Sequence, residues 1–207
     1  MAGRSHDFSK IIPAKHDPNE AMPLVSSLHC AGLNSQSYRG AQGVVTETET
    51  NAEKAIVLYP EGTVPGEWEE TCGGTDMVMI QAIVDMAKAN YCINTDRIFV
   101  TGFSWGADMT NAVGCCLGKN FRAVQPMSGG ESNTGGGDCQ TPTPAYMQTY
   151  ETLDEVYDQG SIQSIIQGYR TLQGCKAAVI DCPLAGVHHT IPNDSKFKMW
   201  SFFSSFK

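Results

Sequence analysis

The chain has 207 residues, of which 41% are hydrophobic, and its net charge is −8 at pH 7. This length supports one hydrophobic core, and therefore a single domain. The acidic balance and the lack of a basic stripe argue against nucleic acid as a partner, and no apolar run is long enough to cross a membrane.

Strands and helices alternate along the first half of the chain. Apolar runs predict strands at residues 23–29, 55–60 and 97–102. Before the third strand, apolar residues at helical spacing predict a helix that opens at Asp76, which we expect to be its N-cap. A second helix is predicted from Gly106 to about Leu117.

The same alternation continues in the second half. Strands are predicted at residues 122–127, 145–150 and 177–180, and helices at residues 161–172 and 196–206. Such a pattern predicts an α/β fold with a mostly parallel sheet that is flanked by helices on both faces. We expect residues 13–207 to form this one domain, and residues 1–12 to be a partly disordered N-terminal segment.

The candidate nucleophile is Ser104, within the motif Gly102-Phe103-Ser104-Trp105-Gly106. The motif lies between a predicted strand and a predicted helix, which is the context that a nucleophile elbow requires. A sharp strand-to-helix turn crowds the backbone, and glycine at positions 102 and 106 tolerates this crowding. The turn also places the Ser104 hydroxyl at a helix N-terminus, where developing negative charge is favoured.

A serine nucleophile needs a base, and the base needs an acid that orients it. In this arrangement the expected chain order is serine, acid, histidine, and only His188 and His189 follow Ser104. The carboxylates between them are Glu131, Asp138, Glu151, Asp154, Glu155, Asp158 and Asp181. Asp154 best fits a position after a strand and before the next helix, with Glu151, Glu155 and Asp158 as its rivals.

An ester-cleaving site also needs an oxyanion hole, which stabilises the tetrahedral intermediate. One donor is expected to be the backbone N–H of Trp105, directly after the nucleophile. The second is expected from the loop after the strand that ends at His29, that is from Cys30 or Ala31.

Eight cysteines are many for a chain of this size. Neither Cys115-Cys116 nor the pair of Cys175 and Cys182 has the spacing of a zinc site, so no metal is expected. We expect disulfides, and therefore an oxidising, extracellular compartment. Residues 1–10 are polar and do not have the pattern of a secretory signal peptide.

Several segments resemble the feruloyl esterase and polyhydroxybutyrate depolymerase-like family of carbohydrate esterases. They are "PLVSSLHCAG", "VLYPEGT", "YCINTDRIFVTGFSWGADMTNAVGC", "FRAVQPMSGG", and "HTIP" with the "MWSFFSSF" helix after it. The resemblance extends from about Pro13 to Phe206. It implies an α/β-hydrolase fold and a secreted serine esterase that acts on an ester substrate through a Ser-Asp-His triad, with no cofactor.

The resemblance implies a role for each triad position. Ser104 corresponds to the family's nucleophile. Asp154 corresponds to the family's acid, because residues 150–154 stand where the family has an "HGTxD" turn. His189 corresponds to the histidine of the family's "GGHT" turn, because Thr190 follows it, and His188 is then expected to point away.

The resemblance also implies a disulfide. The family commonly joins the cysteine of its "YC-x-x-T" segment to a cysteine on the helix after the elbow. In this chain that implies a bond from Cys92 to Cys115, with Cys116 as the alternative partner.

The chain departs from the family's pattern in the catalytic loops. Cys30 stands where the family has glycine before the oxyanion loop. Tyr150 and Glu151 replace the histidine and glycine of the acid turn, and Asp108 replaces the second small residue after the elbow. These changes are expected to affect efficiency.

The leading hypothesis is hydrolysis of an ester between a hydroxycinnamic acid and a plant cell-wall sugar. The alternatives are a polyhydroxyalkanoate or other polyester depolymerase and an acetyl (xylan) esterase, because the depth of the acyl pocket cannot be derived from sequence. A different class is a catalytically impaired relative that binds polysaccharide. Trp68 and Trp105 are candidates to line an aromatic site, whereas Trp200 is expected to pack against the core.

Overall fold

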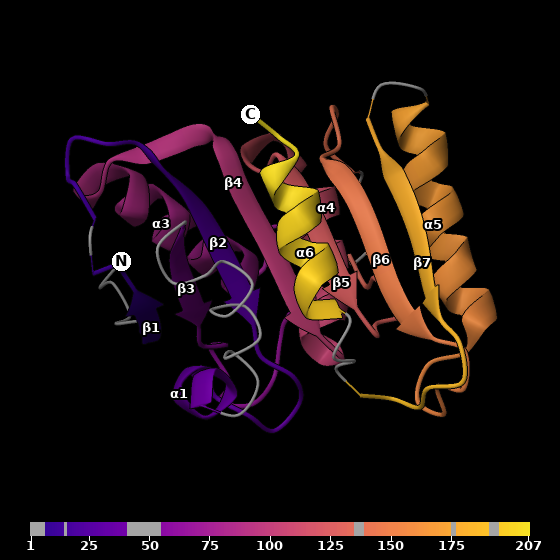
Figure 1. Ribbon diagram of the computed structural model, residues 1–207. Helices are drawn as coiled ribbons and strands as arrows, with labels where there is room; N and C mark the ends of the chain where they lie inside the picture. The colour runs from indigo at the N-terminus through magenta and orange to yellow at the C-terminus, as the bar shows by residue number, and fades with distance from the viewer. Residues whose placement is uncertain (1–6, 15, 41–54, 135–138, 175–176, 191–194) are drawn as a thin grey trace.

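The computed structural model describes residues 7–14, 16–40, 55–134, 139–174, 177–190 and 195–207. Its strands form one seven-stranded sheet in the order β1-β3-β2-β4-β5-β6-β7, in which only the edge strand β1 is antiparallel to its neighbour (Figure 1). The strands are β1 (Phe8–Ile11), β2 (Met22–Leu28), β3 (Ile56–Pro60), β4 (Ile93–Phe103), β5 (Ala123–Met127), β6 (Ala145–Glu151) and β7 (Val179–Leu184). The mostly parallel sheet of the predicted α/β fold is thereby confirmed.

Helices cover both faces of the sheet. They are α1 (Ser35–Tyr38), α3 (Thr75–Asn90), α4 (Trp105–Cys116), α5 (Gln159–Gln173) and α6 (Ser195–Ser204). The helices α3, α4 and α5 pack on one face, and α6 crosses the other, where α1 also contributes (Figure 1). Two separate apolar cores result, one on each side of the sheet.

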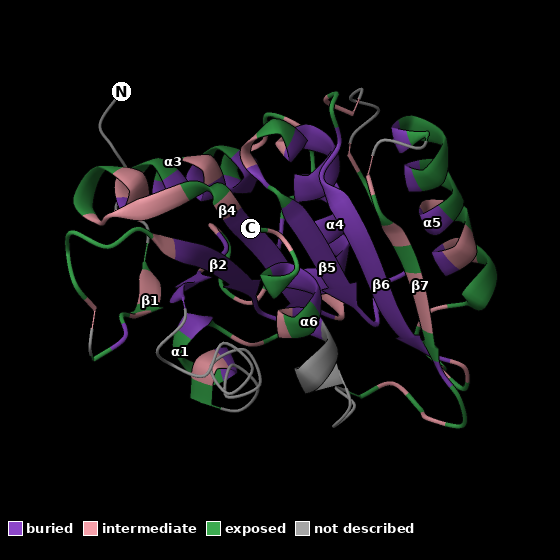
Figure 2. Ribbon diagram, turned by 45° about the horizontal axis from the view of Figure 1, so that its top comes forward, coloured by how far each residue is buried: buried purple, intermediate pink, exposed green. Residues whose placement is uncertain are grey.

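The division between the two cores follows the period of two that a strand imposes. Leu24, Ile98 and Val100 face α3, α4 and α5, whereas Val25 and Phe99 face α6. All five are completely buried, and the central strands are buried along most of their length (Figure 2). Strands covered on both faces are expected to be mostly apolar, and the central strands are so apart from buried polar residues such as Ser26, Ser27 and Gln125.

Part of the predicted N-terminal segment belongs to the sheet. Within residues 1–12, Phe8–Ile11 form β1, and its register runs from Phe8 opposite Pro60 to Ile11 opposite Val57. Residues 8–11 therefore belong to the sheet, while residues 1–6 lie outside the described part of the chain.

The prediction that Asp76 is the N-cap of α3 is wrong. The helix begins at Thr75 after Gly74, and Asp76 lies inside its first turn. The buried Asp76 side chain instead accepts hydrogen bonds from the backbone N–H groups of Thr63, at 2.7 Å, and Glu69, at 2.8 Å. Because one carboxylate holds both ends of residues 63–69, it shapes the loop that leads from β3 to the helix.

The disulfide that the family resemblance implies is also wrong. The bonds are Cys72–Cys116 and Cys115–Cys139, and among the described cysteines Cys92 is a free thiol. Successive residues of a helix point about 100° apart, so the adjacent cysteines of α4 meet different loops. Cys175 lies outside the described residues.

Peptide mapping under non-reducing conditions should recover the two bonds of α4 and a free Cys92. Each bond closes a loop of 24 or 44 residues, so removing either by a double Cys→Ala substitution should lower the free energy of unfolding by about 3–4 kcal/mol. Cys92→Ala is the matched control and should leave the map unchanged. A peptide that joins Cys92 to Cys115 or Cys116 would contradict this pairing.

Candidate active site

Ser104 lies in a strained turn between β4 and α4. Its φ is 56° and its ψ is −123°, a conformation that residues other than glycine rarely adopt. A Cβ at Gly102 would lie 2.2 Å from the Gly106 carbonyl oxygen, and one at Gly106 would lie 2.3 Å from the Leu28 carbonyl oxygen. Both glycines are therefore needed for the turn, and the second lets α4 begin directly against the end of β2.

The structure brings Ser104, His189 and Asp154 into one hydrogen-bonded chain. His189 Nε2 lies 3.1 Å from Ser104 Oγ, and His189 Nδ1 lies 2.8 Å from Asp154 Oδ2. In the tautomer with the proton on Nδ1, His189 donates to Asp154 and accepts from Ser104. The Asp154 side chain is completely buried and that of His189 is 14% exposed. Water therefore has little access to the hydrogen bond between them.

Two backbone groups fix the orientation of Asp154. Its Oδ1 accepts from the N–H of Val156 at 2.7 Å and of Tyr157 at 3.0 Å, which leaves Oδ2 for His189. The ring of Phe103 packs against His189 with 5.0 Å between the ring centroids. The imidazole is thus held by a carboxylate on one edge and by apolar contact on one side.

Other residues considered as the base or the acid lie outside the hydrogen bonds that join Ser104, His189 and Asp154. The His188 side chain is 70% exposed and its Nδ1 lies 3.1 Å from Oε2 of the exposed Glu155. Asp158 is the N-cap of α5, where its carboxylate accepts from the N–H of Ser161. Glu131 is exposed, and Asp138 lies outside the described residues.

Glu151 is a second carboxyl group close to Asp154 and His189. It is completely buried at the end of β6, and Ser128 Oγ donates to its Oε1 at 2.7 Å. Glu151, Asp154 and His189 each offer a polar atom within 4.8 Å of the others. Burial raises the pKa of Glu151 to about 7, and the nearby charge of Asp154 adds to this rise.

This three-residue cluster and the set of Cys72, Cys115 and Cys116 are groupings of the described part of the chain that could hold a metal ion. The three sulfur atoms are engaged in disulfides and cannot serve as thiolate ligands. In the cluster of Glu151, Asp154 and His189, the last two are already hydrogen-bonded to each other. Within the described residues, none of the helices combines the length and apolar character needed to cross a bilayer.

The expected oxyanion donors lie at the junction of β2 and α4. Trp105 is the first residue of α4, so its N–H has no acceptor within the helix. The carbonyl oxygen of His29 accepts from Trp68 Nε1 at 2.8 Å, and the His29 ring stacks on Trp68 and lies 3.0 Å from the Cys30 carbonyl oxygen. These contacts fix the backbone at Cys30; the next residue, Ala31, is exposed.

The tryptophans differ from one another in exposure. Trp68 is only 5% exposed, so it supports the β2 loop rather than lining an open aromatic site. Trp105 is half-buried and its Nε1 donates to Glu70 Oε1 at 2.9 Å. Trp200 is half-buried and packs against the core beneath α6, as expected.

Two residues near Ser104 were not identified from the sequence. Glu70 is buried in the loop before α3, where it holds the Trp105 indole and accepts from the N–H of Asn133. Tyr157 follows the acid turn, donates a hydrogen bond to Asp108 and lies near enough to Ser104 to interact with it. Neither has a spacing signal, because each reaches the site through the path of a loop.

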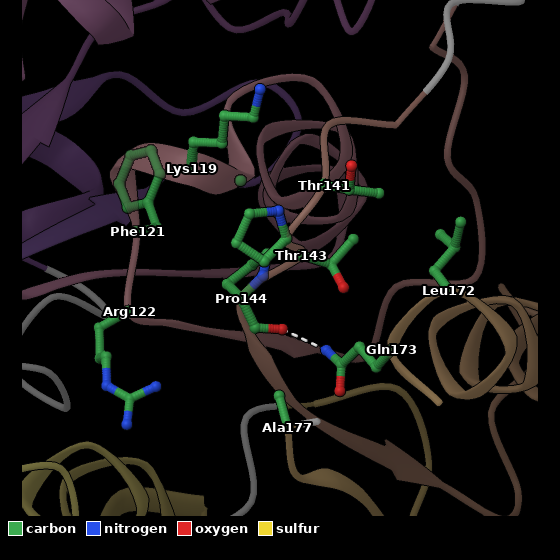
Figure 3. Close-up of a pocket in the computed structure, with 11 residues that line it drawn as sticks. Lys119, Phe121, Arg122, Thr141, Thr143, Pro144, Leu172, Gln173 and Ala177 are labelled. Carbon is green, nitrogen blue, oxygen red and sulfur yellow. Dashed lines mark hydrogen bonds between the residues drawn. The ribbon is translucent and has the colours of Figure 1, made fainter. Parts of the chain in front are cut away.

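A cavity of about 680 Å³ lies beside the N-terminal ends of β5 and β6 (Figure 3). Arg122 and Pro144, which line it, directly precede β5 and β6, whereas Ser104 and Asp154 follow the ends of their strands. Gln173 closes one side, and its Nε2 donates to the Pro144 carbonyl oxygen. The cavity is therefore separate from the candidate active site.

Comparison with known proteins identifies relatives among feruloyl esterases. The chain is 31% identical over 188 residues to the probable feruloyl esterase C of Aspergillus clavatus, a match that covers 89% of this chain and 68% of the relative. It is 28% identical to feruloyl esterase C of Emericella nidulans, over 88% of this chain and 67% of the relative. No family model matches the chain.

Among solved structures, the acetyl xylan esterase from Aspergillus awamori superposes with a TM-score of 0.75 at 20% identity. The match covers 95% of this chain and 93% of that protein. This likeness supports the α/β-hydrolase fold that the strand order and the helix layers already indicate.

The buried Glu151 predicts a pH dependence of stability. Its pKa is about 7 in the folded protein and about 4.3 in an unfolded chain. The folded state therefore binds the proton more tightly, and this stabilisation is full below pH 4 and is lost as the pH rises through 7. Glu151→Gln should remove this loss, and should make the protein more stable than the wild type at pH 8 by up to about 3 kcal/mol.

Urea unfolding at pH 4.5 and pH 8 measures this difference. Glu155→Gln is the matched control, because Glu155 is exposed, and it should leave the change between the two pH values nearly as in the wild type. Equal losses of stability in Glu151→Gln and wild type between these pH values would mean that Glu151 is ionised throughout.

Proposed function

Because the chain belongs to the feruloyl esterase family of carboxylic ester hydrolases, we propose that Ser104, His189 and Asp154 form its catalytic triad. The observation that supports this assignment best is the unbroken chain of hydrogen bonds from Asp154 through His189 to Ser104. Ser104 also has the strained backbone of a nucleophile elbow. We propose further that the substrate is an ester of a hydroxycinnamic acid with plant cell-wall polysaccharide.

In acylation, Ser104 Oγ attacks the ester carbonyl carbon while His189 Nε2 takes the serine proton. The imidazolium that forms is stabilised by the buried Asp154, since burial strengthens the attraction between the two charges. The negative charge on the carbonyl oxygen is stabilised by the N–H of Trp105 and by a second N–H from Cys30 or Ala31.

In the tetrahedral intermediate the bond from the acyl carbon to the sugar oxygen then breaks, and that oxygen takes the proton from His189 Nε2 and leaves as a sugar hydroxyl. The acyl group remains on Ser104 as an ester. In deacylation, His189 removes a proton from water, the hydroxide attacks the acyl carbon, and Ser104 recovers its proton as the free acid leaves. No cofactor is required in either half of the reaction.

We propose an extracellular location for the enzyme. The two disulfides of α4 support it, since disulfides persist in oxidising environments. A substrate on the plant cell wall also lies outside the cell. The two relatives carry the name feruloyl esterase, which supports the choice of an aromatic acyl group over acetate or a polyester.

Substitution of the triad should separate catalysis from folding. Ser104→Ala, His189→Ala and Asp154→Asn should each reduce kcat on methyl ferulate by about 10³-fold or more, because each removes one step of the proton path. His188→Ala is the matched control for His189→Ala and should retain near-wild-type kcat, since its side chain faces solvent. Full activity in Ser104→Ala would overturn the assignment of the nucleophile.

A substrate panel tests the acyl group. Methyl ferulate, p-nitrophenyl acetate, p-nitrophenyl butyrate and a film of polyhydroxybutyrate should be compared by kcat/KM or by release of acid. We expect methyl ferulate to be hydrolysed with the highest kcat/KM, because a pocket that fits the aromatic ring gains binding energy that acetate cannot supply. A preference for acetate would indicate an acetyl esterase, and release from the film alone would indicate a depolymerase.

A fluorophosphonate probe tests whether the protein is an enzyme of this type at all. The wild type should be labelled covalently at Ser104, and Ser104→Ala should not be labelled. Binding of polysaccharide without labelling would instead indicate the catalytically impaired relative.

A further inference from the structure

A second hydroxyl group contacts Ser104 in addition to the imidazole of His189. It belongs to Tyr157, whose hydroxyl lies near enough to that of Ser104 to interact with it, while it donates its proton to Asp108 Oδ2. The Tyr157 ring lies 5.7 Å from the His189 ring, and a Cβ at Gly130 would come within 2.9 Å of it. The ring is therefore held between the imidazole and the loop after β5.

The backbone of Tyr157 is fixed by the same acid that orients His189. Asp154 Oδ1 accepts from the Tyr157 N–H at 3.0 Å, while Asp154 Oδ2 accepts from His189. The positions of the imidazole and of the tyrosine hydroxyl are thus set by one buried carboxylate.

The hydroxyl of Tyr157 is held in turn by Asp108. Tyr157 Oη lies 2.5 Å from Asp108 Oδ2, and Asp108 Oδ1 accepts from the N–H of Glu131 at 2.9 Å. Asp108 is 3% exposed and lies one turn after Ser104 on α4. The path from Ser104 through Tyr157 to Asp108 is thus separate from the path through His189 to Asp154.

We propose that Tyr157 is a further catalytic residue, whose hydroxyl, oriented by Asp108, controls the direction in which the Ser104 proton points. The proposal rests on the function proposed above, in which Ser104 is the nucleophile. It assigns Asp108 as a positioning residue that acts through Tyr157.

The two hydroxyl protons of Ser104 and Tyr157 explain how Tyr157 controls the direction of the Ser104 proton. Ser104 and Tyr157 have one hydroxyl proton each. When Tyr157 donates to Ser104 Oγ, the serine proton is left for His189 Nε2, which is the productive arrangement. When Tyr157 donates to Asp108, its oxygen becomes a competing acceptor for the serine proton.

The state of Asp108 selects between these arrangements. The N–H of Glu131 occupies Oδ1, so a proton on Asp108 resides on Oδ2 and is donated to Tyr157. Burial raises the pKa of Asp108 to about 7, and the charges of Glu70 and Glu131, which face it from two other loops, add to this rise. Below pH 7 the neutral Asp108 favours donation from Tyr157 to Ser104, and above pH 7 the carboxylate draws the tyrosine proton away.

The first test compares Tyr157→Phe with Tyr150→Phe. Each variant removes one hydroxyl, but the hydroxyl of Tyr150 bonds to Gln163 instead of Ser104. Two rates are measured at pH 6.5: kcat/KM for p-nitrophenyl butyrate and the second-order rate of inactivation by a fluorophosphonate. In Tyr157→Phe both rates should fall by about 10- to 100-fold, with KM within about twofold of wild type, while Tyr150→Phe should keep both.

The second test is the pH profile of kcat/KM. The wild type should lose activity on the alkaline side with an apparent pKa near 7, as Asp108 ionises. Asp108→Asn keeps an oxygen for Glu131 and turns an N–H₂ toward Tyr157, so it mimics the neutral acid, and its alkaline loss should be absent.

The outcomes are distinguishable. A wild type that does not react with the fluorophosphonate overturns the proposed function and this inference with it. A reactive wild type with Tyr157→Phe rates within twofold of it overturns the inference alone. A wild-type profile that stays level from pH 7 to pH 9, measured with no substitution, overturns the part assigned to Asp108.

Discussion

The site depends on the close contact between the end of β2 and the start of α4. A Cβ at Gly106 would lie 2.3 Å from the Leu28 carbonyl oxygen and 2.6 Å from the His29 carbonyl oxygen. Because nothing larger than hydrogen fits there, the helix N-terminus, the turn at Ser104 and the loop from Cys30 meet at one point. The strained φ of Ser104 is maintained by this packing, in the way that surrounding structure holds backbone strain at functional sites.

Carboxyl groups surround the nucleophile turn, and burial gives them different roles. Asp154 holds His189 and two backbone N–H groups, so its charge is compensated. The pKa of Glu70 is raised by burial, and those of Asp108 and Glu151 are raised to about 7 by the same cause. Asp108 and Glu151 are thus buried carboxyl groups near the nucleophile turn whose pKa values are raised toward neutrality.

The sequence was sufficient to predict strands and the position of the nucleophile motif where local pattern and tertiary structure agree. The apolar runs correspond to β2 and β3, and the GxSxG motif lies between β4 and α4 as expected. The chain order of serine, acid and histidine limited the base to two residues, and the geometry brings His189 to Ser104 and leaves His188 in solvent. Boundaries were less accurate, since β4 begins at Ile93, four residues before the apolar run does.

Features that depend on the path of the loops could not be derived. Asp76 looked like a helix cap because it precedes apolar residues at helical spacing, but its carboxylate binds the loop before the helix. Cys92 looked like a disulfide partner by resemblance, yet spacing along the chain does not reveal which loops pass the end of α4. Tyr157 and Glu70 reach the site for the same reason and left no sequence signal.

The adjacent cysteines at the end of α4 impose an order on the maturation of the protein. Two neighbouring thiols with partners at Cys72 and Cys139 allow two sets of bridges that differ only by exchange of partners. In an extended chain either thiol can reach either partner, whereas on a helix each faces a single loop. The native isomer is thus selected after that turn of helix has formed, and a chain oxidised earlier must be reshuffled by thiol–disulfide exchange. A host compartment that contains a disulfide isomerase therefore suits the production of this protein better than one that only oxidises thiols.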